Sequence, residues 1–386
     1  MNSSSPVSQS QRTPIVDMLR GWALFSVVVM NYSTIYSWNN HASDVKADTI
    51  SAFIETSSEI LLGSKGWTLL AVLFGFGFSV LLANISAKGQ PVYWFFIKRM
   101  LWLFVFAFVN TLFFGGDILN DYAFVGLLLL FFYRLNSRSL YFAALLVLLL
   151  SPLLQSYLGR LHLLFAPKDR DRFYALYDLH TFPDHIQANL FMRYKWMLRL
   201  SYFIIFHLIQ LGCFLTGMAL QRSNFFLQLH KKTGLVKAVF FTSLVLSVAF
   251  YFLQQAIEKN AWTFNNFYNL YYPQILFTMT CSTTGIMWLY LSGKLKRFFS
   301  AMQAYGRLTL TNYLTQNVIA FVLLICIKPD WPLSWYVLTG VVVYILQVYF
   351  SVWWTSKYHF GLMEWCWRCL SYGKVFPLKK QAGNRS

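Results

Sequence analysis

The chain has 386 residues, of which 57% are hydrophobic, 19% aromatic and only 12% charged. This composition is far from that of soluble globular proteins, so we expect an integral membrane protein. The formal net charge of +18 does not indicate nucleic-acid binding, because no basic face, zinc-ligand spacing or aromatic RNA-binding motif accompanies it.

Ten mostly apolar stretches are each long enough to cross a bilayer as a helix, which takes about 20 residues. We expect an all-α, polytopic bundle over residues 14–355, preceded by a disordered cytoplasmic tail over residues 1–13. No cleavable signal is expected, because the first apolar run is too long for one. The predicted spans are residues 14–36, 65–85, 97–116, 119–134, 139–157, 200–221, 235–256, 270–292, 304–327 and 332–354.

Basic residues gather in alternate connections and in the C-terminal tail, as in multi-pass proteins whose basic loops face the cytoplasm. We therefore expect both termini to be cytoplasmic, in the plasma membrane of a bacterium (the inner membrane). The connection over residues 158–199 breaks this pattern, since it lies on the predicted outer side and carries seven Lys and Arg residues. Its mixed composition favours an interfacial helical segment. Residues 356–380 are expected to form a docked cytoplasmic tail and residues 381–386 a disordered end.

The first predicted span begins with Asp17 and Arg20 and carries Asn31 near its far end. Charged groups inside a bilayer are costly and normally face the bundle interior, where they pair or line a polar cavity. The spacing of three places Asp17 and Arg20 on one helix face, and Gly21 permits a close neighbour. The pair is either an interfacial staple or a cationic site for an anionic ligand.

Other polar groups lie near the predicted outer side. Lys65 begins the second span, where it is either a snorkelling lysine or a site residue. Asp117 and Asp121, in the turn GGDILNDYAF, could each cap the following helix. His41 and His207 are either packing residues or proton-transfer groups, because imidazole titrates near neutral pH.

The ninth span and the tail carry two further motifs. In YGRLTLTNYLTQNVIA, Arg307, Asn312 and Gln316 belong to a polar stripe that either lines a cavity or bonds neighbouring helices. In FGLMEWCWRCLSYG, Glu364 and Arg368 have the i, i+4 spacing of a salt bridge on a surface helix. The single CxxC pair of this tail lacks a second pair, and no metal site is predicted.

In chain order, the segments VDMLRGWAL…MN, GSKGWTLLAVLFGFGFS, GGDILNDYAFVGLLLL, GMALQRSNFF, YGRLTLTNYLTQNVI and HFGLMEWCWRCLSYGK resemble the YeiB-like family, whose C-terminal half is domain of unknown function 418. That family is similar to the transmembrane acyltransferase superfamily, with its acyltransferase-3 and heparan-glucosaminide acetyltransferase branches. The resemblance implies a bundle that takes acyl-CoA, for example acetyl-CoA, from the cytoplasm as a co-substrate. It implies no permanently bound cofactor, and an acceptor hydroxyl or amine in the cell envelope.

The resemblance also has departures. Acyltransferase-3 proteins carry a His eleven positions after the first-span Arg, where this chain has Asn31. The heparan-glucosaminide branch also has Asn there and places its active His in the following loop, where this chain has His41. Many YeiB-like chains carry a His seven residues before the Asp of GDIL, where this chain has Asn110.

The enzyme hypothesis gives these groups roles. Guanidinium groups suit phosphate oxygens, so Arg20, Arg307 and Arg368 would hold the phosphates of a CoA donor. Asn312 and Gln316 would line the path of the pantetheine arm.

Catalysis would take place at the other end of the path. His41 would act as general base or take the acyl group, with Asp117 orienting its imidazole and Asn31 or Asn110 donating to the oxyanion. The alternative is a transporter or exporter of a lipid, peptide or small anionic metabolite, and a third class is a non-catalytic envelope scaffold.

Overall fold

The computed structural model describes residues 13–41, 49–160, 167–179, 181–196, 200–260, 262–327 and 330–380. Within these ranges the fold is helical, and the only β pairing is an isolated bridge between Tyr358 and Lys379. The predicted all-α class is therefore confirmed, while residues 1–12 and 381–386 of the predicted tails lie outside the described residues. The α-helices are α1 Pro14–Asn39, α2 Thr49–Leu61, α3 Lys65–Ala87, α4 Val92–Thr111, α5 Leu119–Leu128, α6 Ser137–Arg160, α7 Pro167–Tyr177, α8 Phe182–Phe191, α9 Leu200–Arg222, α10 Thr233–Lys259, α11 Tyr271–Leu291, α12 Lys296–Gly306, α13 Thr309–Ala320, α14 Leu333–Lys357 and α15 Leu362–Tyr372.

Seven helical stretches among the described residues are long and apolar enough to cross a membrane, and an eighth is added if α12 and α13 count as one broken span. This confirms a multi-pass membrane protein. The helix α5 and the 3-10 turn after it, Leu119–Phe131, are apolar but shorter than those spans. The seven stretches are Pro14–Asn39, Thr49–Ala87, Val92–Thr111, Ser137–Arg160, Phe203–Arg222, Leu229–Lys259 and Leu333–Lys357.

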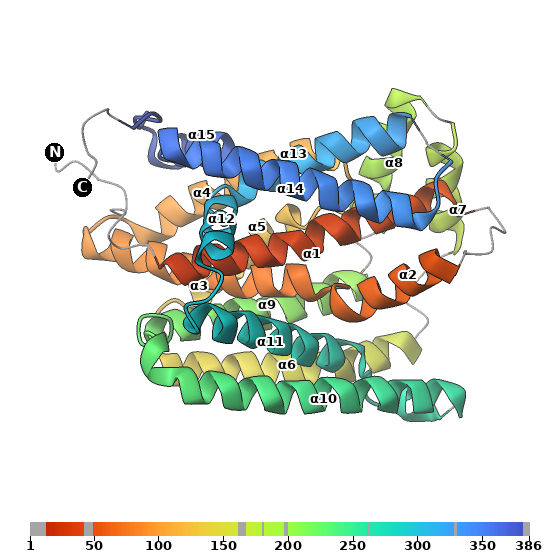
Figure 1. The fold of residues 1–386 in the computed structure, drawn as a ribbon, viewed down its shortest axis with the longest axis horizontal. Helices are drawn as coiled ribbons and strands as arrows, with labels where there is room; N and C mark the ends of the chain where they lie inside the picture. The colour runs from red at the N-terminus through yellow and green to blue at the C-terminus, as the bar shows by residue number, and fades with distance from the viewer. Residues whose placement is uncertain are drawn as a thin grey trace.

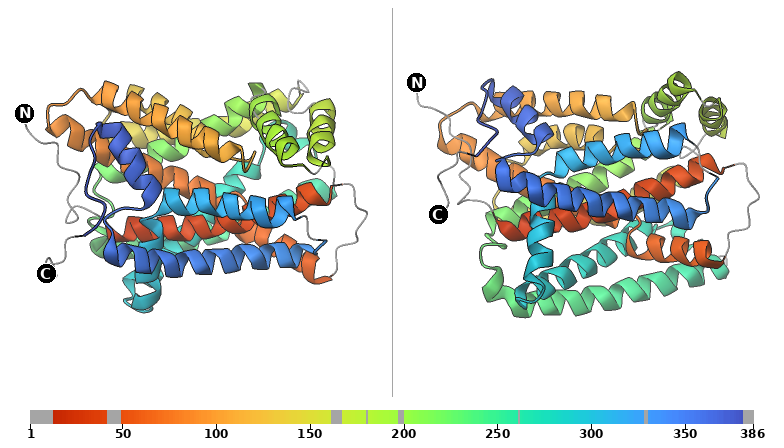
Figure 2. Two further views of the ribbon diagram at one scale, coloured as in Figure 1. Left: turned by 90° about the horizontal axis from the view of Figure 1, so that it is seen from above. Right: turned by 45° about the horizontal axis from the view of Figure 1, so that its top comes forward.

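The long helices run between two ends of the bundle. The start of α1 and the helix α15 lie at one end, which we call the α15 end, and α7 and α8 lie at the other, which we call the α8 end (Figure 1). Figure 2 shows α7 and α8 as a helix pair at the α8 end, in the segment predicted to be interfacial. The side chain of Trp38 on α1 stacks edge-on against Phe173 of α7, with 5.5 Å between ring centroids.

The predicted continuous span over residues 304–327 is wrong, because α12 and α13 meet at an angle of 80°. Figure 1 shows α12 crossing the long helices. Glycine permits this arrangement: a Cβ at Gly306 would lie 1.8 Å from the carbonyl oxygen of Asp17, and one at Gly21 would lie 2.4 Å from that of Met302. The backbones of α1 and α12 thus touch, as the small residue Gly21 predicted.

A second glycine crossing joins α3 and α9. A Cβ at Gly75 would lie 2.0 Å from the carbonyl oxygen of Phe214, and one at Gly217 would lie 1.8 Å from that of Val72. Interhelical packing in lipid depends on close contact, since lipid chains are as apolar as the side chains that they would replace. The two crossings therefore hold α12 against α1 and α9 against α3.

Candidate functional site

A cavity of about 350 Å³ opens near the α15 end, between α1, α3, α4, α5, α15 and the break between α12 and α13. Its inner wall is largely apolar and reaches Tyr122 and Tyr313. The side chains that dominate its charge are four arginines, namely Arg20, Arg99, Arg307 and Arg368. The structure thus brings together the three arginines that the sequence assigned to phosphate and adds a fourth from α4.

Arg20 is held by its neighbours on two sides. Its Nη1 donates to Oδ1 of Asp17 at 2.8 Å, so the pair predicted from the spacing forms. A Cβ at Gly77 would lie 3.0 Å from Nη2 of Arg20, so this glycine leaves room for the guanidinium against α3. The Arg20 side chain keeps 28% exposure, which allows contact with a ligand in the cavity.

Two other arginines are oriented by stacking on aromatic rings of the tail, one on Trp367 of α15 and one on Phe360 just before it. The guanidinium of Arg99 lies 3.7 Å from the ring centroid of Trp367, whose Nε1 donates to the carbonyl oxygen of Arg99 at 2.9 Å. The guanidinium of Arg368 lies 4.4 Å from the ring centroid of Phe360. Stacking on an aromatic face fixes the plane of a guanidinium, and its N–H groups point outward along that plane.

Glu364 is bound to the start of α13. Its Oε1 accepts from the backbone N–H of Leu310 at 2.6 Å and of Thr311 at 3.1 Å, and its Oε2 accepts from the Thr311 hydroxyl at 2.5 Å. These are first-turn donors that a helix leaves unsatisfied, and the helix dipole favours an anion there. Burial raises the pKa of Glu364, an effect opposed by the hydrogen bonds from Thr311. The sequence predicted an exposed surface pair, whereas the structure makes this carboxylate the link between α15 and α13.

Behind the cavity wall, next to Tyr313, lies the buried carboxylate of Asp117, which is 1% exposed. The Tyr313 hydroxyl donates to Oδ1 of Asp117 at 3.2 Å, and Nδ2 of Asn110 donates to the same oxygen at 2.7 Å. Asn120 donates to Oδ2 from both its backbone N–H and its side chain. Every oxygen of this carboxylate therefore has a donor, as a buried charge requires.

Asn317 joins two predicted residues that are far apart in sequence. It donates from Nδ2 to Oδ1 of Asn110 at 3.2 Å, and its own Oδ1 accepts from Nδ2 of Asn31, also at 3.2 Å. Asn31 of α1 is thereby connected to Asp117 through α13 and α4. The sequence reasoning passed over Asn317, although it lies in the same polar stripe as Gln316.

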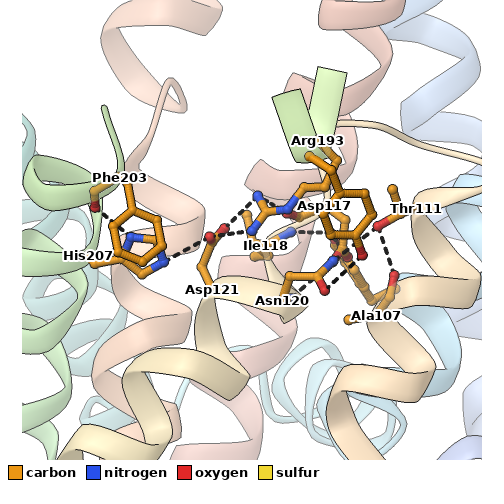
Figure 3. A network of polar contacts seen from close by, with 11 residues as sticks. Ala107, Thr111, Asp117, Ile118, Asn120, Asp121, Arg193, Phe203 and His207 are labelled. Atoms are coloured by element: carbon orange, nitrogen blue, oxygen red, sulfur yellow. Dashed lines mark hydrogen bonds and ion pairs between the residues drawn. The ribbon is translucent and has the colours of Figure 1, made fainter. Parts of the chain in front are cut away.

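A buried ion cluster continues from Asp117 into α9. Arg193 donates from Nη1 to the carbonyl oxygen of Asp117 and to Oδ2 of Asp121, each at 3.1 Å, and from Nη2 to Oδ1 of Asp121 at 2.5 Å. His207 approaches the same carboxylate with Nε2 at 3.1 Å, while its Nδ1 lies 2.5 Å from the carbonyl oxygen of Phe203 (Figure 3). Both ring nitrogens thus face oxygen atoms, which fixes the orientation of the imidazole between Phe203 and Asp121.

This cluster changes the interpretation of Arg193. Arg193 comes from the segment assigned to an outer loop, yet its side chain is 4% exposed and belongs to a π-helical turn, Met192–Trp196. Such turns are frequent at functional sites. Neither Arg193 nor His207 is among the described residues that line the cavity.

His41 lies at the α8 end, and Asp178 rather than Asp117 orients its imidazole. Nε2 of His41 lies 3.2 Å from Oδ2 of Asp178, and Nδ1 lies 2.8 Å from the carbonyl oxygen of Trp38. The ring stacks on Tyr174 of α7 with centroids 3.8 Å apart and planes at 9°. The predicted pairing of His41 with Asp117 is wrong, because Asp117 is engaged by Asn110, Asn120 and Tyr313.

Three more predicted residues lie away from the cavity. Nδ2 of Asn312 donates to the carbonyl oxygen of Tyr305 and to the hydroxyl of Ser351, which places Asn312 in the contact between α13 and α14. Gln316 donates to Asn317 in the polar network. The buried Lys65 donates from Nζ to the carbonyl oxygen of Glu59 at 2.6 Å and bridges α2 to α3. The pantetheine path assigned to Asn312 and Gln316 therefore does not coincide with the cavity.

No group of three His, Cys, Asp or Glu side chains arranged to hold a metal ion occurs in the described ranges.

The fold and the cavity define a multi-pass helical membrane protein with an arginine-lined entrance. Residues 220–374 match the profile of the family described as "Protein of unknown function (DUF418)". It is the family that the sequence motifs indicated.

Two bacterial proteins are similar over their whole length. An uncharacterized 39.9 kDa protein in the amylase 3′ region of Bacillus acidopullulyticus is 24% identical over 403 residues, covering 98% of this chain and 99% of the relative. The uncharacterized protein YxaH of Bacillus subtilis (strain 168) is 24% identical over 422 residues, covering 99% of each. No solved structure matches the chain.

Proposed function

We propose that the cavity binds the CoA part of a cytoplasmic acyl-CoA, and that the protein transfers the acyl group to a hydroxyl or amine at the outer side of a bacterial inner membrane. The observation that carries the proposal is the convergence of Arg20, Arg99, Arg307 and Arg368 on one cavity. In this proposal the α15 end is cytoplasmic, and the seven apolar spans, the broken span of α12 and α13, α5 and α11 make ten passes.

The lining of the cavity has two parts that suit the two parts of such a donor. The arginines offer planar, permanently charged donors to phosphate oxygens. Beyond them the wall is apolar, as a passage for a pantetheine arm and an acyl chain requires, and it includes Leu24, Leu70, Phe74 and Leu103. Tyr313 ends this passage, and its hydroxyl connects the passage to Asp117.

The transfer step would join the acceptor to the acyl carbonyl. The acceptor oxygen or nitrogen forms a bond to the thioester carbon, the carbon–sulfur bond breaks, and the leaving thiolate of CoA takes up the proton that the acceptor loses. His41, oriented by Asp178, is the proposed base for that proton. Its place at the α8 end agrees with an acceptor on the outer side.

The first test is calorimetric titration of acetyl-CoA and desulfo-CoA into the detergent-purified protein. We expect saturable binding of both, weakened at least tenfold in Arg20→Ala because a charge-assisted contact to phosphate is lost. Arg138→Ala is the matched control, since Arg138 lies in the first turn of α6 and does not line the cavity. No binding at millimolar ligand to folded protein would contradict the proposal and favour transport of another solute.

A further inference from the structure

A second basic pocket lies beside the cavity, between α12 and α14 at the α15 end. Its volume is about 630 Å³, and Arg307 forms part of the wall of both spaces. None of the described residues that line it is acidic. They are Lys296, Arg297, Ser300, Ala301, Gln303, Ala304, Arg307, Val352, Thr355 and Ser356.

The helix α12 has the form of an amphipathic helix at a membrane surface. Its inner face buries Phe299 and Met302, while Lys296 and Arg297 are exposed on the other side. It crosses the long helices near their α15 end (Figure 1), and Phe298 beside the basic pair is 47% exposed. Basic residues next to an exposed aromatic ring are typical of a helix at the headgroup level.

A further cation adds to the charge at this place. Nζ of Lys380 donates to the carbonyl oxygen of Thr355 at 2.7 Å, and Thr355 lines the pocket. The pocket is therefore bordered by positive charge from α12, from the break after it and from the C-terminal segment. Cationic N–H groups are strong donors to phosphate oxygens.

An apolar stripe runs along α14 from the pocket. Leu338, Ile345, Tyr349 and Val352 are each at least 45% exposed, and their spacings of seven, four and three place them on one helix face. Val352 also lines the pocket. On a helix that is apolar enough to cross a membrane, such a stripe faces lipid chains.

We infer that this pocket binds the phosphate headgroup of an anionic phospholipid, whose acyl chains lie along the α14 stripe. The basic groups explain the anionic head, and the stripe explains why the ligand is a lipid rather than a soluble anion. Basic pockets between membrane helices bind such headgroups by the same combination of charge and shape. The inference does not depend on the proposed acyl transfer.

The test is native mass spectrometry of the full chain, titrated after delipidation with phosphatidylglycerol or with phosphatidylcholine. We expect the protein to retain phosphatidylglycerol more tightly than phosphatidylcholine. In the Lys296→Ala, Arg297→Ala double variant, retention of phosphatidylglycerol should be about thirtyfold weaker, because each basic residue near an anionic membrane surface contributes about 1 kcal/mol and two contributions correspond to that factor. The matched control is Lys231→Ala, Lys232→Ala, which removes two basic residues before α10 that lie outside the pocket.

The outcomes separate the alternatives. The site is supported if the Lys296→Ala, Arg297→Ala variant loses phosphatidylglycerol binding, the control variant retains it, and both keep the wild-type unfolding temperature. Equal loss of lipid binding in both variants would mean that the lipid responds to the total surface charge and not to this pocket, and would overturn the proposed site. Displacement of the lipid by millimolar glycerol phosphate would show a soluble-anion site and would overturn the assignment to a lipid.

Discussion

The hydroxyl of Tyr313 lies 3.2 Å from Oδ1 of Asp117, and the same tyrosine lines the arginine-rich cavity. One side chain of α13 thus joins the space open to a ligand with a buried carboxylate. A change in the cavity that moves Tyr313 would therefore reach the network that includes Asn110 and Asn120.

Tyr313→Phe should lower the free energy of unfolding by about 1–3 kcal/mol, because a buried carboxylate loses a hydrogen-bond donor. Thermal unfolding of the detergent-purified protein measures this. Tyr349→Phe is the control and should leave the unfolding temperature unchanged, since Tyr349 is 72% exposed. Equal stability of the two variants would mean that the hydrogen bond contributes nothing.

Asp121→Asn should destabilise the protein far more, by about 3–5 kcal/mol, because Arg193 would keep a buried positive charge without its counter-ion. The yield of monodisperse protein and its unfolding temperature report this effect. Asp171→Asn, at an exposed surface pair with Arg170, should have no measurable effect. A stable Asp121→Asn protein would refute the assignment of a buried ion cluster.

Gly306→Ala should destabilise the contact between α1 and α12 by at least about 1–3 kcal/mol, because the added methyl group meets the backbone of Asp17 at 1.8 Å. The displaced Asp17 should also weaken binding of CoA at Arg20. Gly234→Ala is the matched control, since a Cβ there meets no atom within 4 Å and alanine favours helix. Thermal unfolding of both variants, with titration of desulfo-CoA, distinguishes packing from a general effect of alanine.

Glu364 should make stability depend on pH. Because burial raises its pKa in the folded state, the folded protein holds this proton more tightly than the unfolded chain. The stabilisation from this proton is present in full below the ordinary pKa of a glutamate and is lost as pH rises through the higher pKa of the folded state. Unfolding temperatures across this window should fall with rising pH in wild type relative to Glu364→Gln.

The control for that pH series is Glu258→Gln, at a carboxylate near the exposed end of α10. Its pH profile should match that of wild type. If the unfolding temperature of Glu364→Gln also follows the wild-type pH profile, the pKa of Glu364 does not differ between the folded and the unfolded protein.

His41→Ala should abolish release of free CoA thiol in the presence of an acceptor while leaving CoA binding intact, because His41 lies at the α8 end, away from the arginines. A thiol-reactive dye and the calorimetric titration measure the two properties. Asp178→Asn should reduce the rate in the same direction, since it leaves the imidazole with a weaker partner. Unchanged thiol release in His41→Ala would exclude this histidine as the base.

The sequence alone determined the helical class and the positions of most long helices. The backbone of a chain in lipid must satisfy its own hydrogen bonds, so a long apolar run specifies a helix whatever surrounds it. For this reason the predicted starts of α1, α3 and α9 agree with the structure. The i, i+3 pair of Asp17 and Arg20 was predictable for the same local reason.

Only the tertiary structure decided which polar groups meet. Arg99 was not singled out in the predicted span 97–116, and Arg193 was part of the predicted outer connection, yet the first lines the cavity and the second binds Asp121. The break between α12 and α13 turns Arg307 toward the cavity and moves Asn312 to the contact with α14. Which side chains meet depends on how each helix is rotated and on where glycines let two backbones touch. These are properties of pairs of helices, so they cannot be predicted from one apolar stretch of sequence.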